Sequence, residues 1–358
     1  MPVYTYLVAD LMTNTILGEL PLTSVTFSQV LNGAGAFSGE LHMGDPRIKA
    51  AAVTNMTIPG RTALYVDRDG VLVWGGIIWT RAYDDATRVL TITGNEFWSY
   101  FRRRLISSDT IWPSPSDPLV MVRQIIGTAQ NMPYGNIGVQ IGTETSATVQ
   151  SFGVHGYDLK PAGEAVEEMS VLGFDFGIDV QYDSTGRPAK TLHLACPRRG
   201  RNATATGLMF EKPGNIAAYT WPDDATEQAT AVYAQGSGDG VAMIRSTTSA
   251  PELLAAGWPL LETGVAYKDI SVQTQLDGHA RADMRKRRYV MTIPKLTVRA
   301  DLDPVLGSYI TGDECRIRIT DEYQSVDTYR RILLIEVTPP EDRTPESVDL
   351  TMGEALDQ

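Results

Sequence analysis

Four histidines are the first side chains in this sequence that could act as a general base or bind a metal ion: His42, His155, His193 and His279. None lies near a GxSxG nucleophile turn, and the sequence contains no HExxH zinc-binding helix. Two of them fall in strand-like runs, and His279 lies on the polar side of an expected helix. We therefore expect surface or hydrogen-bonded histidines, with no catalytic residue and no metal ligand.

A glycine-rich stretch at residues 235–240 could in principle cradle a phosphate group. A dinucleotide site needs a strand before the glycines and a helix after them, so that the pyrophosphate meets the helix amino terminus. Here the glycines are followed by Val241, Ala242, Met243 and Ile244, which look like a strand. The stretch is more typical of a flexible hairpin, and we expect no cofactor.

Three pairs of adjacent carboxylates could indicate a glycosidase: Asp84 with Asp85, Glu167 with Glu168, and Asp223 with Asp224. Glycoside hydrolysis needs two carboxylates that converge across a cleft, one of them with a raised pKa. Adjacent acids in turns and on a helix face do not show this arrangement. Solvated acids are therefore the better interpretation of all three pairs.

Two further groups of residues could make contacts with other proteins. The basic run Arg285-Lys286-Arg287-Arg288 ends a helix, where it complements the helix dipole and forms salt bridges, or contacts an acidic neighbouring subunit. Trp74 and Trp79 are an odd number of positions apart in one strand-like run. Their side chains should face opposite sides of a regular strand, unless a bulge at the glycines between them changes this.

The composition describes a globular chain of 358 residues, 43% of them hydrophobic, with a formal net charge of −12. The acidic balance argues against nucleic-acid binding, although it would suit a surface past which nucleic acid slides. Cys196 and Cys315 form no CxxC pair, which favours folding in a reducing cytoplasm. The first residues do not resemble a signal peptide, and no apolar run is long enough to cross a bilayer.

The order of expected elements predicts a mainly β chain with an α+β insert and three modules. Residues 1–106 alternate strands and turns, with the clearest hairpin around Asp67-Arg68-Asp69-Gly70 and a short helix that Asn95 would cap. A proline cluster that includes Pro113 marks a linker.

The second module, residues 107–213, holds two expected helices. Asp117 and Pro118 open the first helix, and the second has Leu172 on its apolar side. Residues 214–358 return to strands around a helix at 271–287, whose apolar positions Val272, Leu276, Ala280 and Met284 are four apart.

Parts of the sequence resemble the minor tail proteins of actinobacterial siphophages. The first part comprises RTALYVDRDGVLVWGGIIW at 61–79, RVLTITG at 88–94 and YFRRR at 100–104. Near the carboxyl end, the helix with Leu276, Ala280 and Met284 is followed by strands and by GSYITGD at 307–313. That pattern is similar to the closing segment of tail-hub proteins, whose fold resembles the baseplate hub of contractile-tailed phages.

The resemblance implies two β-barrel modules like tail-tube subunits, so that three chains make a pseudo-sixfold ring at the tail tip. The implied partners are sister copies, the distal tail protein, the tape measure protein and receptor-binding or other minor tail proteins. The protein would be assembled in the host cytoplasm and carried in the virion. Some related proteins add a wall hydrolase after the hub. Because the sequence ends at Gln358 after the last expected strand, we expect no such domain and no enzyme activity.

Three alternatives remain open at this point. The chain could be a tail-associated cell-wall hydrolase, or a receptor- or carbohydrate-binding module that uses an exposed aromatic side chain such as Trp221 or Trp258. It could also be a distal tail protein, which would form a hexameric ring instead of a trimeric one. Copy number, the surfaces used and the host receptor do not follow from the residues.

Overall fold

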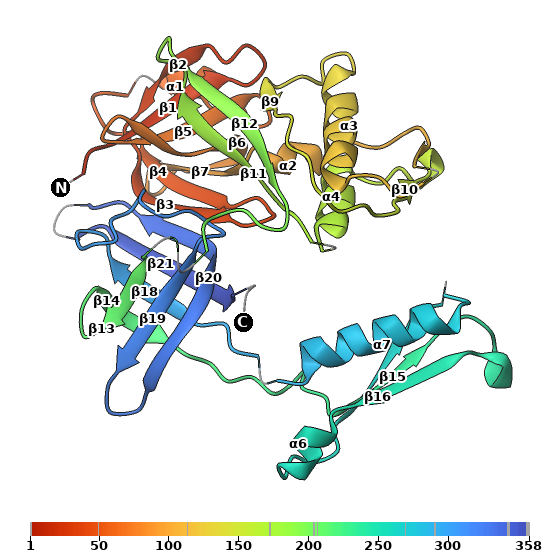
Figure 1. Cartoon of the computed structure of the whole chain (residues 1–358). Coiled ribbons are helices and arrows are strands. Elements are labelled where there is room, and N and C mark those ends of the chain that lie inside the picture. The colour runs from red at the N-terminus through yellow and green to blue at the C-terminus, as the bar shows by residue number, and fades with distance from the viewer. Residues whose placement is uncertain are drawn as a thin grey trace. The chain divides into compact units, whose positions relative to one another are not determined.

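The computed structural model describes residues 2–355 apart from 49, 113, 172, 203, 204, 206, 269, 290, 342 and 343. It divides into two compact units, one made of Met1–Tyr219 with Leu296–Gln358, the other of Thr220–Lys295 (Figure 1). The predicted division into three modules at 1–106, 107–213 and 214–358 stays a prediction. The two compact units have other boundaries. The predictions for Pro113 and Leu172 lie outside the described residues.

The first unit begins with seven antiparallel strands that run side by side in the order β3-β4-β7-β6-β5-β1-β2. Their alternating pattern puts every second side chain into the interior, as in β4, where Phe37, Gly39 and Leu41 are buried. The strands are β1 (Tyr4–Asp10), β2 (Ile16–Leu20), β3 (Thr23–Val30), β4 (Ala36–His42), β5 (Thr62–Arg68), β6 (Val71–Asp84) and β7 (Val89–Glu96). Two short helices accompany them, α1 (Ala50–Met56) and α2 (Trp98–Phe101).

An α+β segment follows, and it packs against this first set of strands. Asp117 caps helix α3 (Pro118–Asn131) by accepting a hydrogen bond from the Leu119 backbone N–H, with Pro118 at the first helical position as predicted. The other elements are β8 (Thr110–Ile111), β9 (Val139–Ile141), β10 (Gly153–Val154), η1 (Gly156–Asp158), α4 (Ala162–Ser170), β11 (Asp175–Tyr182) and β12 (Pro188–Ala195). One hydrophobic cluster joins the two parts, because Trp98 and Phe101 of α2 lie in it with Val166 of α4 and Phe176 of β11.

The remaining strands of the first unit continue the same sheet. They are β13 (Met209–Lys212), β14 (Ile216–Thr220), β18 (Lys295–Arg299), β19 (Glu314–Thr320), β20 (Ser325–Thr338) and β21 (Ser347–Glu354). Strand β20 pairs with β19 and β21 and, through Leu334–Val337, also with β3. All 13 strands therefore belong to one sheet. The mainly β class with an α+β insert is confirmed, while the closure of each strand set into a barrel stays a prediction.

The second unit is a three-stranded sheet with one helix on it. The strand order is β16 (Arg245–Ser249), β15 (Ala231–Gln235), β17 (Glu262–Ala266), where β15 pairs antiparallel with β16 and parallel with β17. Helix α7 (Gln273–Arg287) buries Leu276, Ala280 and Met284, three of the four positions of the predicted stripe. The fourth, Val272, precedes the helix as its N-cap residue and is 48% exposed, because the helix begins one residue after it. Helix α6 (Pro251–Ala255) follows β16.

Two local predictions differ from the structure. Asn95 does not cap α2: it lies in β7, where its backbone pairs with both β4 and β6, and this pairing on two sides outweighs its capping preference. The glycine-rich stretch 235–240 does connect the antiparallel strands β15 and β16, as predicted. However, the residues after it form the short turn η2 (Gly240–Ala242) before β16 begins, instead of continuing as a strand.

Candidate functional site

The most deeply buried charged pair of the first unit joins β11 to β20. Arg331 of β20 forms an ion pair with Asp175 of β11, and their side chains are only 7% and 6% exposed. The Arg331 Nε–H also donates to the backbone oxygen of Gly312 at 3.0 Å. Removing two charges from water is costly, and such a pair persists only when further hydrogen bonds satisfy both groups.

The Asp175 carboxylate receives those further hydrogen bonds from two other segments. The Asn32 side-chain amide, in the turn after β3, donates to it at 2.8 Å, and the Arg199 backbone N–H, in the loop after β12, donates at 2.6 Å. Asn32 in turn accepts a hydrogen bond from the Phe176 backbone N–H at 2.8 Å. One carboxylate therefore ties together a turn, a loop and two strands that are far apart in the sequence.

A second set of ion pairs extends this junction along the loop after β12. The Arg201 guanidinium binds the Asp313 carboxylate, with 2.6 Å between Nη2 and Oδ2, and the Asp313 side chain is fully buried. Arg198 pairs with Glu314, whose side chain is 4% exposed. We call the set Asp175, Arg198, Arg199, Arg201, Asp313, Glu314 and Arg331 the ionic junction. It fixes the α+β segment to the carboxyl-terminal strands.

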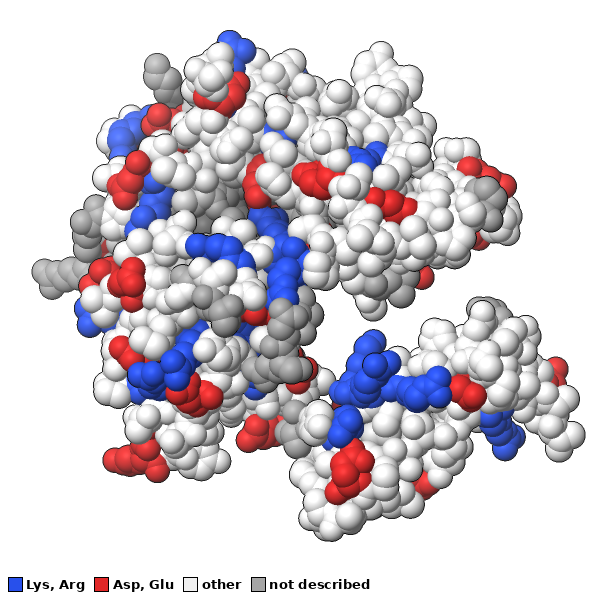
Figure 2. All heavy atoms as spheres, in the orientation of Figure 1, with Lys and Arg blue, Asp and Glu red and all other residues white. Residues whose placement is uncertain are grey.

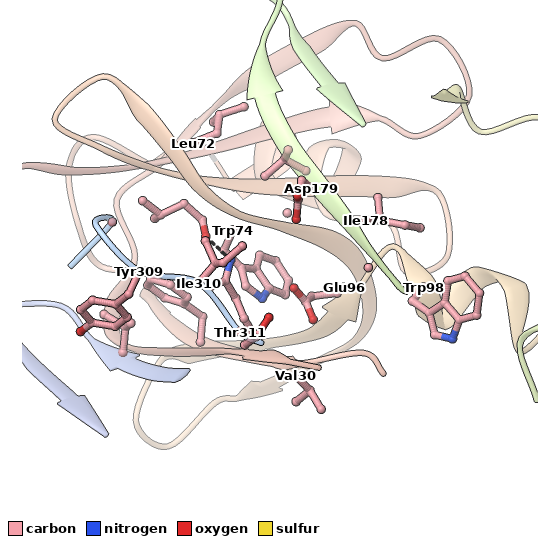
Figure 3. Close-up of a pocket in the computed structure, with 18 of the residues that line it drawn as sticks. Val30, Leu72, Trp74, Glu96, Trp98, Ile178, Asp179, Tyr309, Ile310 and Thr311 are labelled. Carbon is pink, nitrogen blue, oxygen red and sulfur yellow. Dashed lines mark hydrogen bonds between the residues drawn. The ribbon is translucent and has the colours of Figure 1, made fainter. Parts of the chain in front are cut away.

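A cavity of about 280 Å³, drawn in Figure 3, adjoins the junction, because Arg199 also lines this cavity. Aromatic and aliphatic side chains make up most of its wall, including Trp74 and Tyr309, and Asp179 and Arg199 add charge. Glu96, at the end of β7, also lines the cavity, where its Oε2 accepts a hydrogen bond from the Gly35 backbone N–H at 2.6 Å. Burial raises the pKa of Glu96 to about 8, although the backbone N–H groups and the nearby Arg199 act in the opposite direction.

Glu96 should make the first unit less stable as the pH rises. Its pKa is near 4.5 when the chain is unfolded and about 8 when folded, so the folded state binds the proton more tightly. Its contribution is fully present below pH 4.5 and is lost as the pH rises to about 8. A Glu96→Gln variant keeps an acceptor for Gly35 but cannot ionise, so its unfolding free energy should fall less across this window. Urea unfolding from pH 4 to pH 9, a range of about five units that spans both pKa values, tests this. Parallel curves for the two proteins would contradict it.

The histidines that the sequence offers for catalysis are not brought together. His155 and His193 are about half exposed, each with a nitrogen 3.6 Å from a different aspartate, Asp109 and Asp179. His42 is exposed at the end of β4, and His279 packs on the Tyr267 ring with 4.6 Å between centroids. In the described part of the chain, no three His, Cys, Asp or Glu side chains are grouped so that they could hold a metal ion. None of the helices described there is long and apolar enough to cross a membrane.

Each of the three acid pairs makes local contacts of its own. Glu167 accepts hydrogen bonds from the Trp98 indole N–H and from Arg102, while Glu168 pairs with Lys160. Asp84 ends β6 and accepts from the Ala86 N–H. Asp224 forms a β-bridge with Met291 and accepts from the Thr226 N–H, and Asp223 accepts from the Thr292 hydroxyl. These contacts are those of structural acids.

The two tryptophans of β6 do differ in environment. Trp74 is 1% exposed and donates its indole N–H to the Ser28 backbone oxygen at 2.9 Å. Trp79 is half-buried, under the Arg103 guanidinium, which lies 4.3 Å from its ring centre. Strand β6 has two register shifts, one between Leu72 and Trp74 against β5 and one between Ile78 and Thr80 against β7, and neither lies at the glycines.

Comparison with known proteins shows which fold these elements make. No protein-family model matches the sequence, and no curated protein matches it either. Among solved structures, the 43 kDa tail protein of prophage MuSo2 from Shewanella oneidensis aligns with a TM-score of 0.66 at 14% identity, over 98% of both chains. A tail protein from Neisseria meningitidis aligns with a TM-score of 0.61 at 12% identity, over 98% of this chain and 96% of that one.

A third solved structure connects the fold to a wider group. It is an Escherichia coli component of the type VI secretion system, described as structurally similar to the T4 bacteriophage tail proteins gp27 and gp5. Its TM-score is 0.51 at 10% identity, over 94% of this chain and 75% of that one. The chain therefore has the fold of phage tail proteins of the hub type, along nearly its whole length.

Proposed function

We propose that this protein is a structural subunit of a phage tail tip, a baseplate hub whose copies form a trimeric ring. The ring would join the end of the tail tube to host-recognition proteins and form part of the DNA conduit. The observation that carries the proposal is the fold likeness to phage tail proteins over 98% of the chain. Its partners would be sister copies, the distal tail protein, the tape measure protein and receptor-binding proteins.

The construction of the first unit supports a mechanical role. Strand β20 belongs to the carboxyl-terminal strands and also pairs with β3 of the amino-terminal set, so one hydrogen-bonded sheet runs continuously from one set to the other. The ionic junction adds a second, side-chain connection through Asp175 and Arg331. A ring subunit needs such a rigid body, because its contacts on both sides must keep a fixed geometry.

Surface features of the same unit are compatible with a place in a ring. Strand β2 is an end strand of the sheet, and its Ile16 and Leu17 side chains are 41% and 42% exposed. An end strand with apolar side chains is a surface that proteins usually cover. The formal charge of −12 would repel DNA phosphates from a conduit wall, and Figure 2 shows acidic side chains spread over the visible face.

Imaging and mass measurement together test the proposal. Virions labelled with an antibody against this chain should carry the label at the tail tip, and the native mass of the assembled ring should correspond to three copies. Six copies would favour the distal tail protein instead. Label along the tube, or none on the particle, would overturn the proposal.

A further inference from the structure

The second unit has a thin hydrophobic core. Its fully buried apolar side chains form two small clusters, and most of them are alanines: Ala229, Val232, Ala250 and Met284 in one, Ala234, Leu276 and Ala280 in the other. Helix α7 covers one face of the sheet, while Tyr233 and Gln235 of the central strand β15 are exposed on the other. A small unit with so little buried apolar surface gains much of its stability from association.

Helix α7 carries more basic side chains than its own unit uses. Arg287 pairs with Glu227, and Arg288 pairs with Glu252. Arg281, Arg285 and Lys286 are exposed, and none of the three makes an ion pair within the part of the chain that the structure describes. The basic run that the sequence singles out is therefore divided between salt bridges inside the unit and side chains that face solvent.

Three of these arginines line one groove. Arg281, Arg285 and Arg288 follow each other at spacings of four and three, which places them on one side of the helix. With Thr248 and Ser249 at the end of β16, they border a groove of about 370 Å³. Glu252 also lines this groove and pairs with Arg288, which leaves Arg281 and Arg285 as the basic side chains that a ligand could reach. Figure 2 shows basic side chains gathered on the second unit. Guanidinium and hydroxyl groups are hydrogen-bond donors that together suit a carboxylate-bearing ligand.

The distribution of charge along the chain points to another copy as the source of that ligand. Residues 220–295 contain 8 basic and 9 acidic residues, whereas the rest of the chain contains 23 basic and 34 acidic ones. The negative charge of the protein therefore belongs almost entirely to the first unit. In a ring of identical chains, opposite charges would favour the approach of the groove of one copy to the acidic unit of its neighbour.

The turn between β19 and β20 is an exposed acidic segment of the first unit. It projects from the first unit at the end of a long hairpin (Figure 1) and carries Asp321, Glu322 and Tyr323, the last 88% exposed. Asp321 holds the turn by accepting hydrogen bonds from the backbone N–H groups of Tyr323 at 2.9 Å and Gln324 at 2.8 Å. An acid beside an exposed aromatic ring complements arginine, which binds carboxylates and stacks on rings.

We propose that the α7 groove of one copy binds the β19–β20 turn of a second copy. The inference rests on the proposed ring and names the surfaces that would close it. A contact between two different surfaces of identical chains makes a ring when the rotation closes. The groove supplies Arg281 and Arg285, and the turn supplies Glu322 and Tyr323.

Sedimentation of the full chain over a range of protein concentrations tests this contact. The wild-type chain should self-associate, and less so at high salt, which screens exposed charges. An R281E/R285E variant should associate at least about tenfold more weakly, since close interfacial charge pairs are worth more than ~1.4 kcal/mol. R187E/K268E, which changes the charge equally at exposed sites outside the groove, should associate as the wild type does.

Charge exchange identifies the partner surface. R285E and E322K should each weaken association, and the variant with both changes should recover it, because the acid introduced into the groove of one copy then meets the base introduced into the turn of the next. Failure of this recovery, or a wild-type chain that stays monomeric at every concentration, would overturn the inference. If R281E/R285E still forms trimers, the groove is excluded while the proposed ring stands, and antibody labelling of the tail tip tests the proposed function independently.

Discussion

An Arg331→Met variant is expected to lose about 3–5 kcal/mol of unfolding free energy, because it leaves the Asp175 carboxylate buried without its counter-ion. Both side chains are less than one-tenth exposed, so water cannot replace the lost guanidinium. The backbone oxygen of Gly312 would lose its donor as well. Urea unfolding followed by tryptophan fluorescence measures the change, since Trp74, Trp79 and Trp98 all lie in the first unit.

Arg316→Met is the matched control for this measurement. Arg316 lies on the neighbouring strand β19 and also binds an aspartate through two nitrogens, at 2.6 Å each to Asp327. However, the side chains of this pair are 39% and 46% exposed, and exposed pairs contribute less than about 1 kcal/mol. Equal losses in the two variants would show that burial does not give the Asp175–Arg331 pair its importance.

Trp98→Ala should also cost about 3–5 kcal/mol, because it removes a large side chain that is 1% exposed. The Trp98 ring lies 4.2 Å from the centre of the Phe176 ring and 5.6 Å from that of Phe101. Its indole N–H donates to Glu167 at 2.7 Å, so the substitution also weakens the contact between α2 and α4. The midpoint of urea unfolding should fall accordingly.

Tyr323→Ala, measured at a protein concentration at which the chain is monomeric, provides the comparison for this loss of an aromatic ring. Tyr323 is 88% exposed in the turn after β19, so its removal opens no cavity in the core. Substitutions at such surface positions usually change the unfolding free energy by less than about 0.5 kcal/mol. A Trp98→Ala protein as stable as Tyr323→Ala would show that the cluster around α2 does not stabilise the first unit.

Local signals in the sequence predicted the elements that local chemistry controls. The turn between β5 and β6 has Asp69 and Gly70 at φ angles of 54° and 85°, the conformation for which the Asp-Gly pair is favoured. The start of α3 at Asp117 and Pro118 and the apolar stripe of α7 follow from short spacings in the same way. Each of these features depends on residues within about two helical turns of one another.

Local sequence signals could not predict contacts between residues that are far apart in the chain. Asp175 and Arg331 are separated by more than 150 positions, and the sequence shows only an acid between two phenylalanines and an arginine before an isoleucine. The cavity around Glu96 was missed for the same reason, because β7, β11 and the loop after residue 305 meet only in the folded chain. Helix α7 packs on β15 and β16 in the second unit, and its apolar spacing alone does not identify these strands as its partners.

The three-way pairing of β20 determines how the first unit responds to a pulling force. Residues 334–337 of this strand are bonded to β3 on one side while the same stretch is bonded to β21 on the other. Tension along β20 therefore acts in shear on its hydrogen bonds to β3 and on those to β21. Hydrogen bonds loaded in shear must break together, whereas those loaded from one end of a strand pair break one after another. Strand β20 can therefore transmit force between the two strand sets.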